Sequence, residues 1–314
     1  MSAPPVSRGA VIVEESVRVH HLLDRERVLG PVLLAPLLIY LAALVGVPLV
    51  TVFIYSFSDA TTGSESFSFV GLETFQRTIA DPVFRTALRN TIVFTVISQL
   101  IVVVLATVLG FVISADFRGK WFVRFLILLP WTTPVALSSL AWLWMLDSLF
   151  SPFNWILGQL HVVPVGTPVA WLGETNLAMG SVVALQAWRT LPLATVILMA
   201  GLTSIPPELN EQAEIDGAGF WRRLLDITFP LLAPIMMVAI LFGIVATFTD
   251  MAAVYILTRG GPGDATQVLA SWSFYTGIQG GSLAQGAAIG IFMFPVLLGV
   301  CVLMLRRASS VDTT

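Results

Sequence analysis

The sequence predicts an all-α membrane protein that crosses the bilayer about six times. The chain has 314 residues, of which 56% are hydrophobic and 11% are charged, and its mean hydropathy is +0.88. A soluble domain carries roughly 25% charged residues, so this chain has too few charges to cover a water-facing surface. The composition therefore excludes a soluble enzyme, a disordered chain and a fibrous protein.

Six continuous apolar stretches are long enough to cross the bilayer, whose hydrocarbon core takes about 20 helical residues. Because the runs are continuous rather than alternating, we expect helices and not the strands of a barrel. The stretches cover residues 28–57, 91–114, 123–147, 177–203, 231–257 and 284–305. The chain then divides into an N-terminal tail, 1–27, a membrane domain, 28–305, and a C-terminal tail, 306–314.

The distribution of Lys and Arg predicts the orientation, because loops on the cytoplasmic side carry the excess of basic residues. Four basic residues flank the stretches on one side, namely Arg77, Arg85, Arg89 and Arg259. Eleven lie on the side of both termini, namely Arg8, Arg18, Arg25, Arg27, Arg118, Lys120, Arg124, Arg222, Arg223, Arg306 and Arg307. Both termini are therefore expected in the cytoplasm.

The N-terminal tail is not expected to be a cleaved signal, because several acidic residues precede the first apolar run. These residues are Glu14, Glu15, Asp24 and Glu26. Within the tail, residues 11–23 could form an amphipathic helix on the membrane surface or remain a loosely attached segment, and both alternatives stay open.

The residues that carry covalent or metal chemistry are scarce. One cysteine, Cys301, lies inside an apolar run, so a disulfide within the chain is excluded. The three histidines, His20, His21 and His161, lie outside the spans and show no metal-ligand spacing. We therefore expect a chain that is not an enzyme and holds no cofactor of its own.

One loop on the cytoplasmic side, residues 204–234, contains signals for two short helices. Pro206 and Pro207 suit the first turn of a helix, which should run to Asp216 and end at Gly217–Gly219. A second helix should run from residue 220 to about 228, and Pro230 should start the fifth span. Two short helices at an angle predict a compact projection into the cytoplasm.

The same loop contains a spaced motif. Glu211, Gln212 and Ala213 are followed by three residues, Gly217, nine residues, Ile227, one residue, Phe229 and Pro230. This spacing resembles the signature of permease subunits of binding-protein-dependent ABC importers, in which Ala and Leu stand where this chain has Gln212 and Phe229. The run Ile215–Ala218 is also typical of the sugar-transporting members. The alternative is an ordinary amphipathic linker.

The resemblance implies that the loop seats in a cleft of a separate cytoplasmic ATPase, which would bind ATP and Mg. Glu211 would reach a basic group on the ATPase, and Gly217 would set the bend between the two helices. The other expected coupling residues are Gln212, Ala213, Asp216, Ile227 and Pro230.

Two further motifs narrow the resemblance. Residues 255–262, Tyr-Ile-Leu-Thr-Arg-Gly-Gly-Pro, with Thr266 and the run Trp188–Pro192, are similar to elements of maltose-type carbohydrate permeases. The implied assembly has a second permease subunit, an ATPase dimer and an extracytoplasmic solute-binding protein, in a bacterial inner membrane. Gly260–Pro262 lacks the Lys-Ser/Thr of a phosphate loop, so we expect an external turn there.

Two charged residues fall inside predicted spans, where a charge costs about 2.5–3.5 kcal/mol at mid-bilayer. Arg189 lies in the fourth span and Asp250 in the fifth. They could pair with each other or line a wet cavity for a sugar, and these alternatives are compatible. Together with Gln186, Trp188 and Thr247 they are the candidate substrate pathway. The rival function is a stand-alone secondary transporter or channel that uses Arg189 and Asp250.

Other polar and aromatic residues in the spans have simpler interpretations. Trp142 and Trp144 are expected near the outer membrane interface, and Gln99 and Gln285 in contacts between helices. The resemblance leaves the solute unnamed, since sugars and polyol phosphates are both carried by similar permeases.

Overall fold

The computed structural model describes residues 26–64, 66–164 and 167–311. In these ranges every regular element is helical, apart from an isolated bridge between Ser58 and Phe69. Five helices are long and apolar enough to cross a membrane, and a bent helix pair brings the number to six. The prediction of an all-α protein with about six spans is confirmed. Residues 11–23, the possible surface helix, lie outside the described residues.

The chain divides into two compact units, residues 1–51 and 52–314. The described part of the first contains α1 (Glu26–Leu41), the π-helical turn η2 (Ala42–Gly46) and the start of α2 (Val47–Ser56). The wide turn ends two residues before Pro48, which has no backbone N–H to donate into a regular helix. A second wide turn, η3 (Leu224–Thr228), likewise ends two residues before Pro230.

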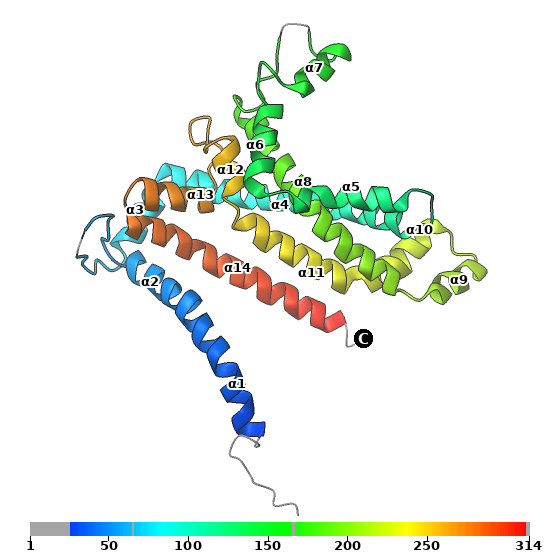
Figure 1. The fold of residues 1–314 in the computed structure, drawn as a ribbon, viewed down its shortest axis with the longest axis horizontal. Coiled ribbons are helices and arrows are strands. Elements are labelled where there is room, and N and C mark those ends of the chain that lie inside the picture. The colour runs from blue at the N-terminus through cyan, green and yellow to red at the C-terminus, as the bar shows by residue number, and fades with distance from the viewer. Residues whose placement is uncertain (1–25, 65, 165–166, 312–314) are drawn as a thin grey trace, which may run out of the picture. The chain divides into compact units, whose positions relative to one another are not determined.

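In the second unit, four long helices lie side by side as a bundle (Figure 1). They are α4 (Pro82–Ser114), α8 (Thr175–Ser204), α11 (Phe229–Phe248) and α14 (Leu283–Val311). The helix α4 begins nine residues before the expected span, because Asp81 accepts a hydrogen bond from the Val83 N–H and Pro82 occupies the first turn.

The third predicted span, 123–147, is wrong as a single helix. It consists of α5 (Lys120–Thr132) and α6 (Val135–Met145), which meet at 100°. The break falls at Thr133, whose ψ of 131° is extended. Pro134 disfavours the helical conformation of the residue before it and donates no hydrogen bond. The short helix α7 (Pro152–Gln159) follows α6 and lies away from the bundle (Figure 1).

The fifth predicted span, 231–257, also differs at both ends. Helix α10 (Phe220–Arg223) continues through η3 into α11, so Pro230 lies inside a continuous helix and does not start it. At the other end α11 stops at Phe248, and a separate helix, α12 (Ala252–Leu257), follows. Asp250 therefore lies in a break between two helices and not inside a span.

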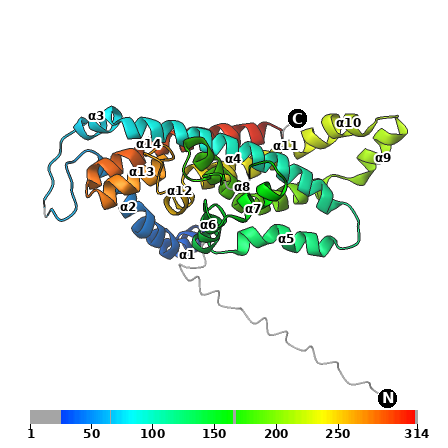
Figure 2. The same cartoon turned by 90° about the horizontal axis from the view of Figure 1, so that it is seen from above.

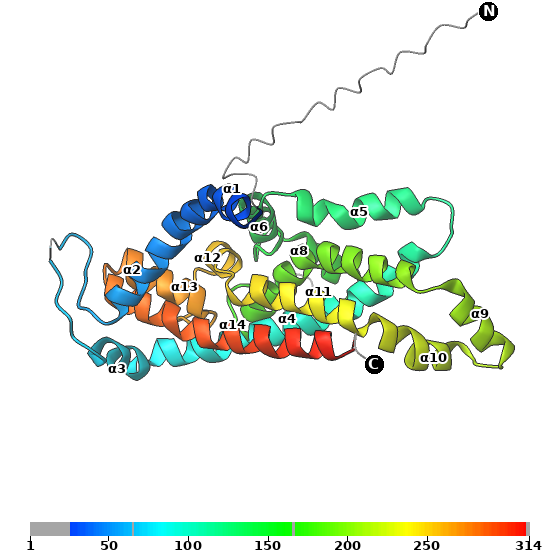
Figure 3. The same cartoon turned by 90° about the horizontal axis from the view of Figure 1, so that it is seen from below.

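The two ends of the second unit differ in structure. The helix α9 (Pro207–Ile215) and α10 lie at one end, beyond the ends of α8 and α11 (Figures 2 and 3). At the opposite end lie α3 (Glu73–Ala80), α13 (Leu269–Phe274) and the turn η4 (Tyr275–Gln279). The tail expected from residue 306 begins as helix, since α14 continues to Val311.

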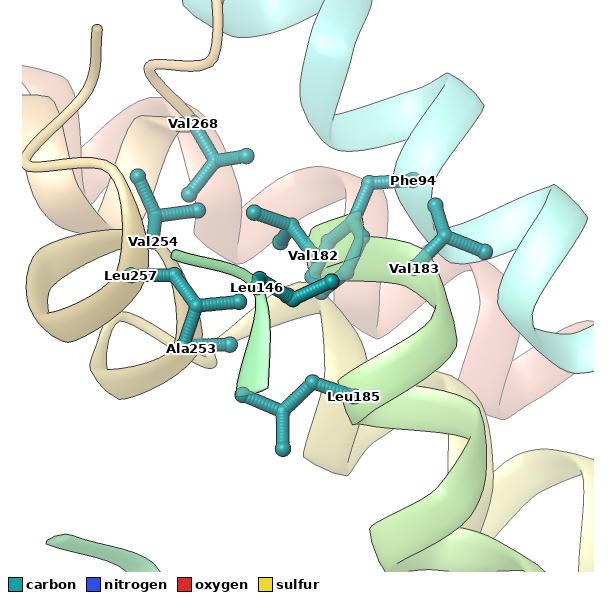
Figure 4. Packing of buried hydrophobic residues seen from close by; sticks show 9 residues of the cluster. All are labelled: Phe94, Leu146, Val182, Val183, Leu185, Ala253, Val254, Leu257 and Val268. Carbon is teal, nitrogen blue, oxygen red and sulfur yellow. The ribbon is translucent and has the colours of Figure 1, made fainter. Parts of the chain in front are cut away.

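A buried apolar cluster joins α4, α6, α8 and α12 near the end that carries α3 and α13. Figure 4 shows Phe94 and Leu146 packed among valines of α8 and the side chains of α12. Trp142, expected at the membrane interface, packs against this cluster with its ring 5.9 Å from that of Trp188. Trp144 is 63% exposed. The cluster holds α12 against α8, which positions the chain break that contains Asp250.

The loop after α2 is held by its own polar contacts. Ser68 donates its hydroxyl and its backbone N–H to the Asp59 carboxylate, both at 2.6 Å. These bonds favour the charged carboxylate and lower the pKa of Asp59 below its ordinary value.

Candidate functional site

Two regions of the second unit contain the residues selected from the sequence. The first, called here the central polar layer, consists of Gln99 on α4, Gln186 and Arg189 on α8, Thr247 at the end of α11, and Asp250 in the break between α11 and α12. The second, called the α9–α10 knob, covers residues 207–223.

Thr247 joins three helices in the central polar layer. The Nε2 of Gln99 donates to the Thr247 hydroxyl oxygen at 3.0 Å, and the Nε2 of Gln186 donates to the same oxygen at 3.2 Å. All three side chains are buried. Gly243, one turn earlier on α11, makes this approach possible, because a Cβ there would lie 2.1 Å from Oε1 of Gln99. The expected role of Gln99 in a helix–helix contact is confirmed.

Arg189 and Asp250 form an ion pair. The Nη2 of Arg189 lies 2.9 Å from Oδ2 of Asp250, and the two side chains are 16% and 8% exposed. The second carboxylate oxygen, Oδ1, accepts the backbone N–H of Ala253 at 2.9 Å, in the first turn of α12. Of the alternatives left by the sequence, pairing is therefore observed, and the attraction between the two charges offsets part of the cost of burying them.

A cavity of about 260 Å³ lies beside the ion pair, between α4, α5, α6, α8 and α11. Its polar and aromatic lining comes from Arg189, Thr190, Thr133 and Trp131. The Nη1 of Arg189 is buried and has no hydrogen-bond partner among the described residues. The cavity wall as described offers one guanidinium, two hydroxyls and an indole for hydrogen bonding.

The structure separates the five pathway residues into three groups. Gln186 and Thr247 bind each other, Arg189 and Asp250 pair, and Trp188 packs against Trp142 instead of lining the cavity. The sequence reasoning missed Trp131 and Thr133, because it treated 123–147 as one helix. The dipeptide Thr133-Pro134 was the available signal for the break that brings them to the cavity.

The bend of the α9–α10 knob is a Schellman motif, in which a helix ends with two backbone bonds around a left-handed residue. The N–H of Ala218 donates to the carbonyl of Ala213 at 2.8 Å, and the N–H of Gly217 donates to that of Glu214 at 3.0 Å. Gly217 has φ of +78°, which glycine adopts without strain. The spacing from Ala213 to Gly217 and Ala218 is thus the spacing of this motif.

The outer surface of the knob is exposed and partly apolar. Glu211, Gln212 and Asp216 are exposed, and so are four large apolar side chains. These are Ile215 at 85%, Trp221 at 70%, Phe220 at 60% and Leu209 at 38%. Large apolar groups gathered at a projecting tip indicate an interaction surface.

An ion pair joins the two helices of the knob. The Nη1 of Arg223 on α10 lies 3.0 Å from Oε2 of Glu214 on α9. Arg223 also lines a pocket of about 280 Å³ with Phe111 and Leu202, which lie near the ends of α4 and α8. The knob is therefore connected to the bundle through α10. Of the remaining expected coupling residues, Ile227 is half-buried and Pro230 is exposed at the start of α11.

Comparison with known proteins agrees with these features. Residues 106–310 match the family described as the binding-protein-dependent transport system inner membrane component. The chain is 31% identical to the trehalose/maltose transport system permease protein MalF of Thermococcus litoralis, over 90% of this chain and 94% of that protein. It is 29% identical to the sulfoquinovosyl glycerol transport system permease protein SmoG of Agrobacterium fabrum, over 91% and 92%.

The fold is also that of a solved transporter. A chain in the crystal structure of a bacterial ABC transporter for import of the acidic polysaccharide alginate superimposes with a TM-score of 0.79, at 18% identity, over 92% of this chain and 97% of that one. With the bundle, the broken helices and the knob, these matches show that the chain belongs to the family of inner-membrane components of binding-protein-dependent transport systems.

Proposed function

We propose that this chain is one of two transmembrane subunits of an ATP-driven carbohydrate importer. The family is described by its dependence on a binding protein, which supports delivery of the solute by such a protein. The names of two relatives support a carbohydrate as the solute. One is named for trehalose and maltose, and another, the permease DasB of Streptomyces coelicolor, for diacetylchitobiose uptake. The binding protein would deliver the solute from the outside, and both termini would lie in the cytoplasm.

The observation that carries the proposal is the exposed α9–α10 knob. Its apolar tip and the carboxylate of Glu211 form a surface suited to a separate ATPase dimer, which would bind ATP and Mg²⁺. Gly217 sets the shape of this surface, and the Ala213 carbonyl accepts the hydrogen bond that closes the bend. Gln212 and Asp216 would contact the ATPase, while Ile227 and Pro230 would connect the knob to α11.

Movement of the knob would be transmitted to the pathway through continuous helix. From Phe220 to Phe248 there is no break, so a displacement of α10 moves the end of α11 that carries Thr247. ATP binding would draw the ATPases together and shift the two permease subunits between inward-open and outward-open states. Gln186, Trp188, Arg189, Thr247 and Asp250 would lie along, or support, the solute path in this subunit.

The test is co-purification of the ATPase with variants of the knob. We expect Gly217→Leu and Glu211→Lys to lower the amount of ATPase that remains bound after gentle solubilisation. Leucine at 217 is strained at positive φ by about 1–2 kcal/mol, whereas lysine reverses the charge of an exposed contact. Gly219→Leu is the matched control, because Gly219 has φ of −69° and open space around it.

Retention of the ATPase and of solute uptake by both knob variants would contradict the docking proposal. Uptake that continues without any ATPase, and that Asp250→Asn abolishes, would instead support the stand-alone secondary transporter.

A further inference from the structure

We propose that the Arg189–Asp250 pair makes this chain's part of the pathway selective for uncharged, polyhydroxylated solutes over anionic ones. The inference rests on the proposed function, because it assigns the class of solute at the same cavity. The relatives include permeases named for an uncharged solute and for an anionic one. One is a permease for trehalose and maltose, whereas another is a permease for sn-glycerol-3-phosphate.

The positive charge of Arg189 is compensated by the neighbouring carboxylate of Asp250. The carboxylate of Asp250 is 2.9 Å from the guanidinium, and both side chains are largely buried. Two opposite charges at this distance in a poorly solvated place behave as a dipole, so an anion gains little from approaching them. An anion beside Arg189 would also meet the negative charge of Asp250.

The rest of the cavity wall, as far as the structure describes it, supplies no other charge. Of the described residues that line it, only Arg189 is charged, and the other polar lining comes from threonine hydroxyls and an indole. An unpaired arginine would make this wall an anion site. The ion pair leaves a wall with hydrogen-bonding groups and no net charge.

Uncharged hydrogen-bonding groups remain in the cavity for a neutral solute. The wall carries the hydroxyls of Thr133 and Thr190 and the indole of Trp131. Hydroxyl oxygens accept hydrogen bonds and the indole N–H donates one, so these groups match the hydroxyl groups of a sugar or polyol. Asp250 determines specificity by compensating the charge of Arg189, and it is not itself among the residues that line the cavity.

The experiment uses the whole complex, with both permease subunits and the ATPase, in lipid nanodiscs. Equilibrium binding is measured for inorganic phosphate, trehalose and trehalose 6-phosphate, of which the last two differ by one phosphate group. In the wild type we expect no saturable phosphate binding and tighter binding of trehalose than of its phosphate ester.

In Asp250→Asn, the side-chain oxygen can still accept the Ala253 N–H, but the charge of Arg189 is no longer compensated. We expect saturable phosphate binding that weakens at high salt, and a shift of at least about tenfold in relative affinity toward the ester. The matched control is the double variant Arg189→Gln, Asp250→Asn, in which neither charge is present. It should not bind phosphate, and it should keep the preference of the wild type for trehalose over the ester, because the wall again carries no net charge.

The inference is overturned if the wild type binds phosphate saturably or prefers the ester, and also if assembled Asp250→Asn gains neither property. If Asp250→Asn does not assemble, the wild type and the double variant provide the test. Saturable phosphate binding by either of them, or a preference of the wild type for the ester, then overturns the inference. The proposed function fails separately, through the co-purification test above. A wild type that binds no trehalose, with Asp250→Asn gaining phosphate, would support the charge compensation and exclude trehalose as the solute.

Discussion

In the central polar layer, Gly243 allows two helices to approach each other, whereas in the α9–α10 knob, Gly217 allows one chain to turn. A Cβ at Gly243 would overlap the amide of Gln99, but a Cβ at Gly217 would meet no atom within 4 Å. Only the second glycine has a positive φ. The same residue type is therefore required by packing in one region and by backbone conformation in the other.

The regions also differ in where their side chains find partners. In the layer, the two glutamines share Thr247, and Arg189 pairs with Asp250, so the main contacts lie within this chain. In the knob, Ile215 and Trp221 are mostly exposed. Substitutions in the layer should therefore lower the stability of this subunit, whereas substitutions in the knob should lower its coupling to a partner.

The largest loss of stability is expected from Gly243→Val. An unchanged stability of this variant would contradict the comparison of the two glycines. The new side chain displaces Gln99 from Thr247, and overpacking with the loss of a buried hydrogen bond costs about 3 kcal/mol. The measurement is the apparent melting temperature of the solubilised subunit. Gly299→Val in α14 is the control, since a Cβ there has open space. Equal melting temperatures for the two variants would refute the packing argument.

A smaller effect is expected from Thr247→Val, which keeps the shape of the side chain and removes its oxygen. Both glutamine amides then lose their common acceptor, at a cost of about 1–3 kcal/mol. Thr203→Val is the control, because the exposed Thr203 hydroxyl bonds only to carbonyls of its own helix. Thermal unfolding should separate the two variants. A melting temperature for Thr247→Val as high as that of the control would show that the layer contributes little to stability.

The smallest effect on stability is expected from the ion pair that joins α9 to α10. Glu214→Arg or Arg223→Glu should change the stability by less than about 1 kcal/mol, because Glu214 is exposed. Either change should still raise the number of ATP molecules hydrolysed per solute molecule transported, because the ion pair that connects α9 to α10 is lost. The charge-exchanged double variant should restore the ratio.

The control for this pair is Asp226→Arg, which breaks the exposed contact between Arg222 and Asp226 within one helix. It changes a charge on the same segment without affecting the connection between α9 and α10. An unchanged transport ratio in Glu214→Arg, or an equal change in the Asp226 variant, would rule out the proposed role of the pair.

Much of the fold followed from local signals in the sequence. Continuous apolar runs predicted the spans, and Pro206, Pro207 and the glycines at 217 and 219 predicted two short helices with a bend between them. These features depend on neighbouring residues, through bilayer thickness and backbone conformation. The errors were also local in origin. The helix of the third predicted span is interrupted at Thr133-Pro134, and that of the fifth is interrupted after Phe248. Hydropathy shows that both predicted spans are apolar, but it does not show where a helix ends within them.

By itself, the sequence determined that the chain is a helical membrane protein with a glycine-bent projection, because composition and spacing encode these properties directly. Only the tertiary structure decided that Arg189 pairs with Asp250, 61 positions away, and that Thr247 is shared by Gln186 and the still more distant Gln99. Apolar periodicity shows which face of a helix is buried but not which helix lies against it. The partner of a buried polar group depends on how the helices pack, and that packing defines the cavity and its charge.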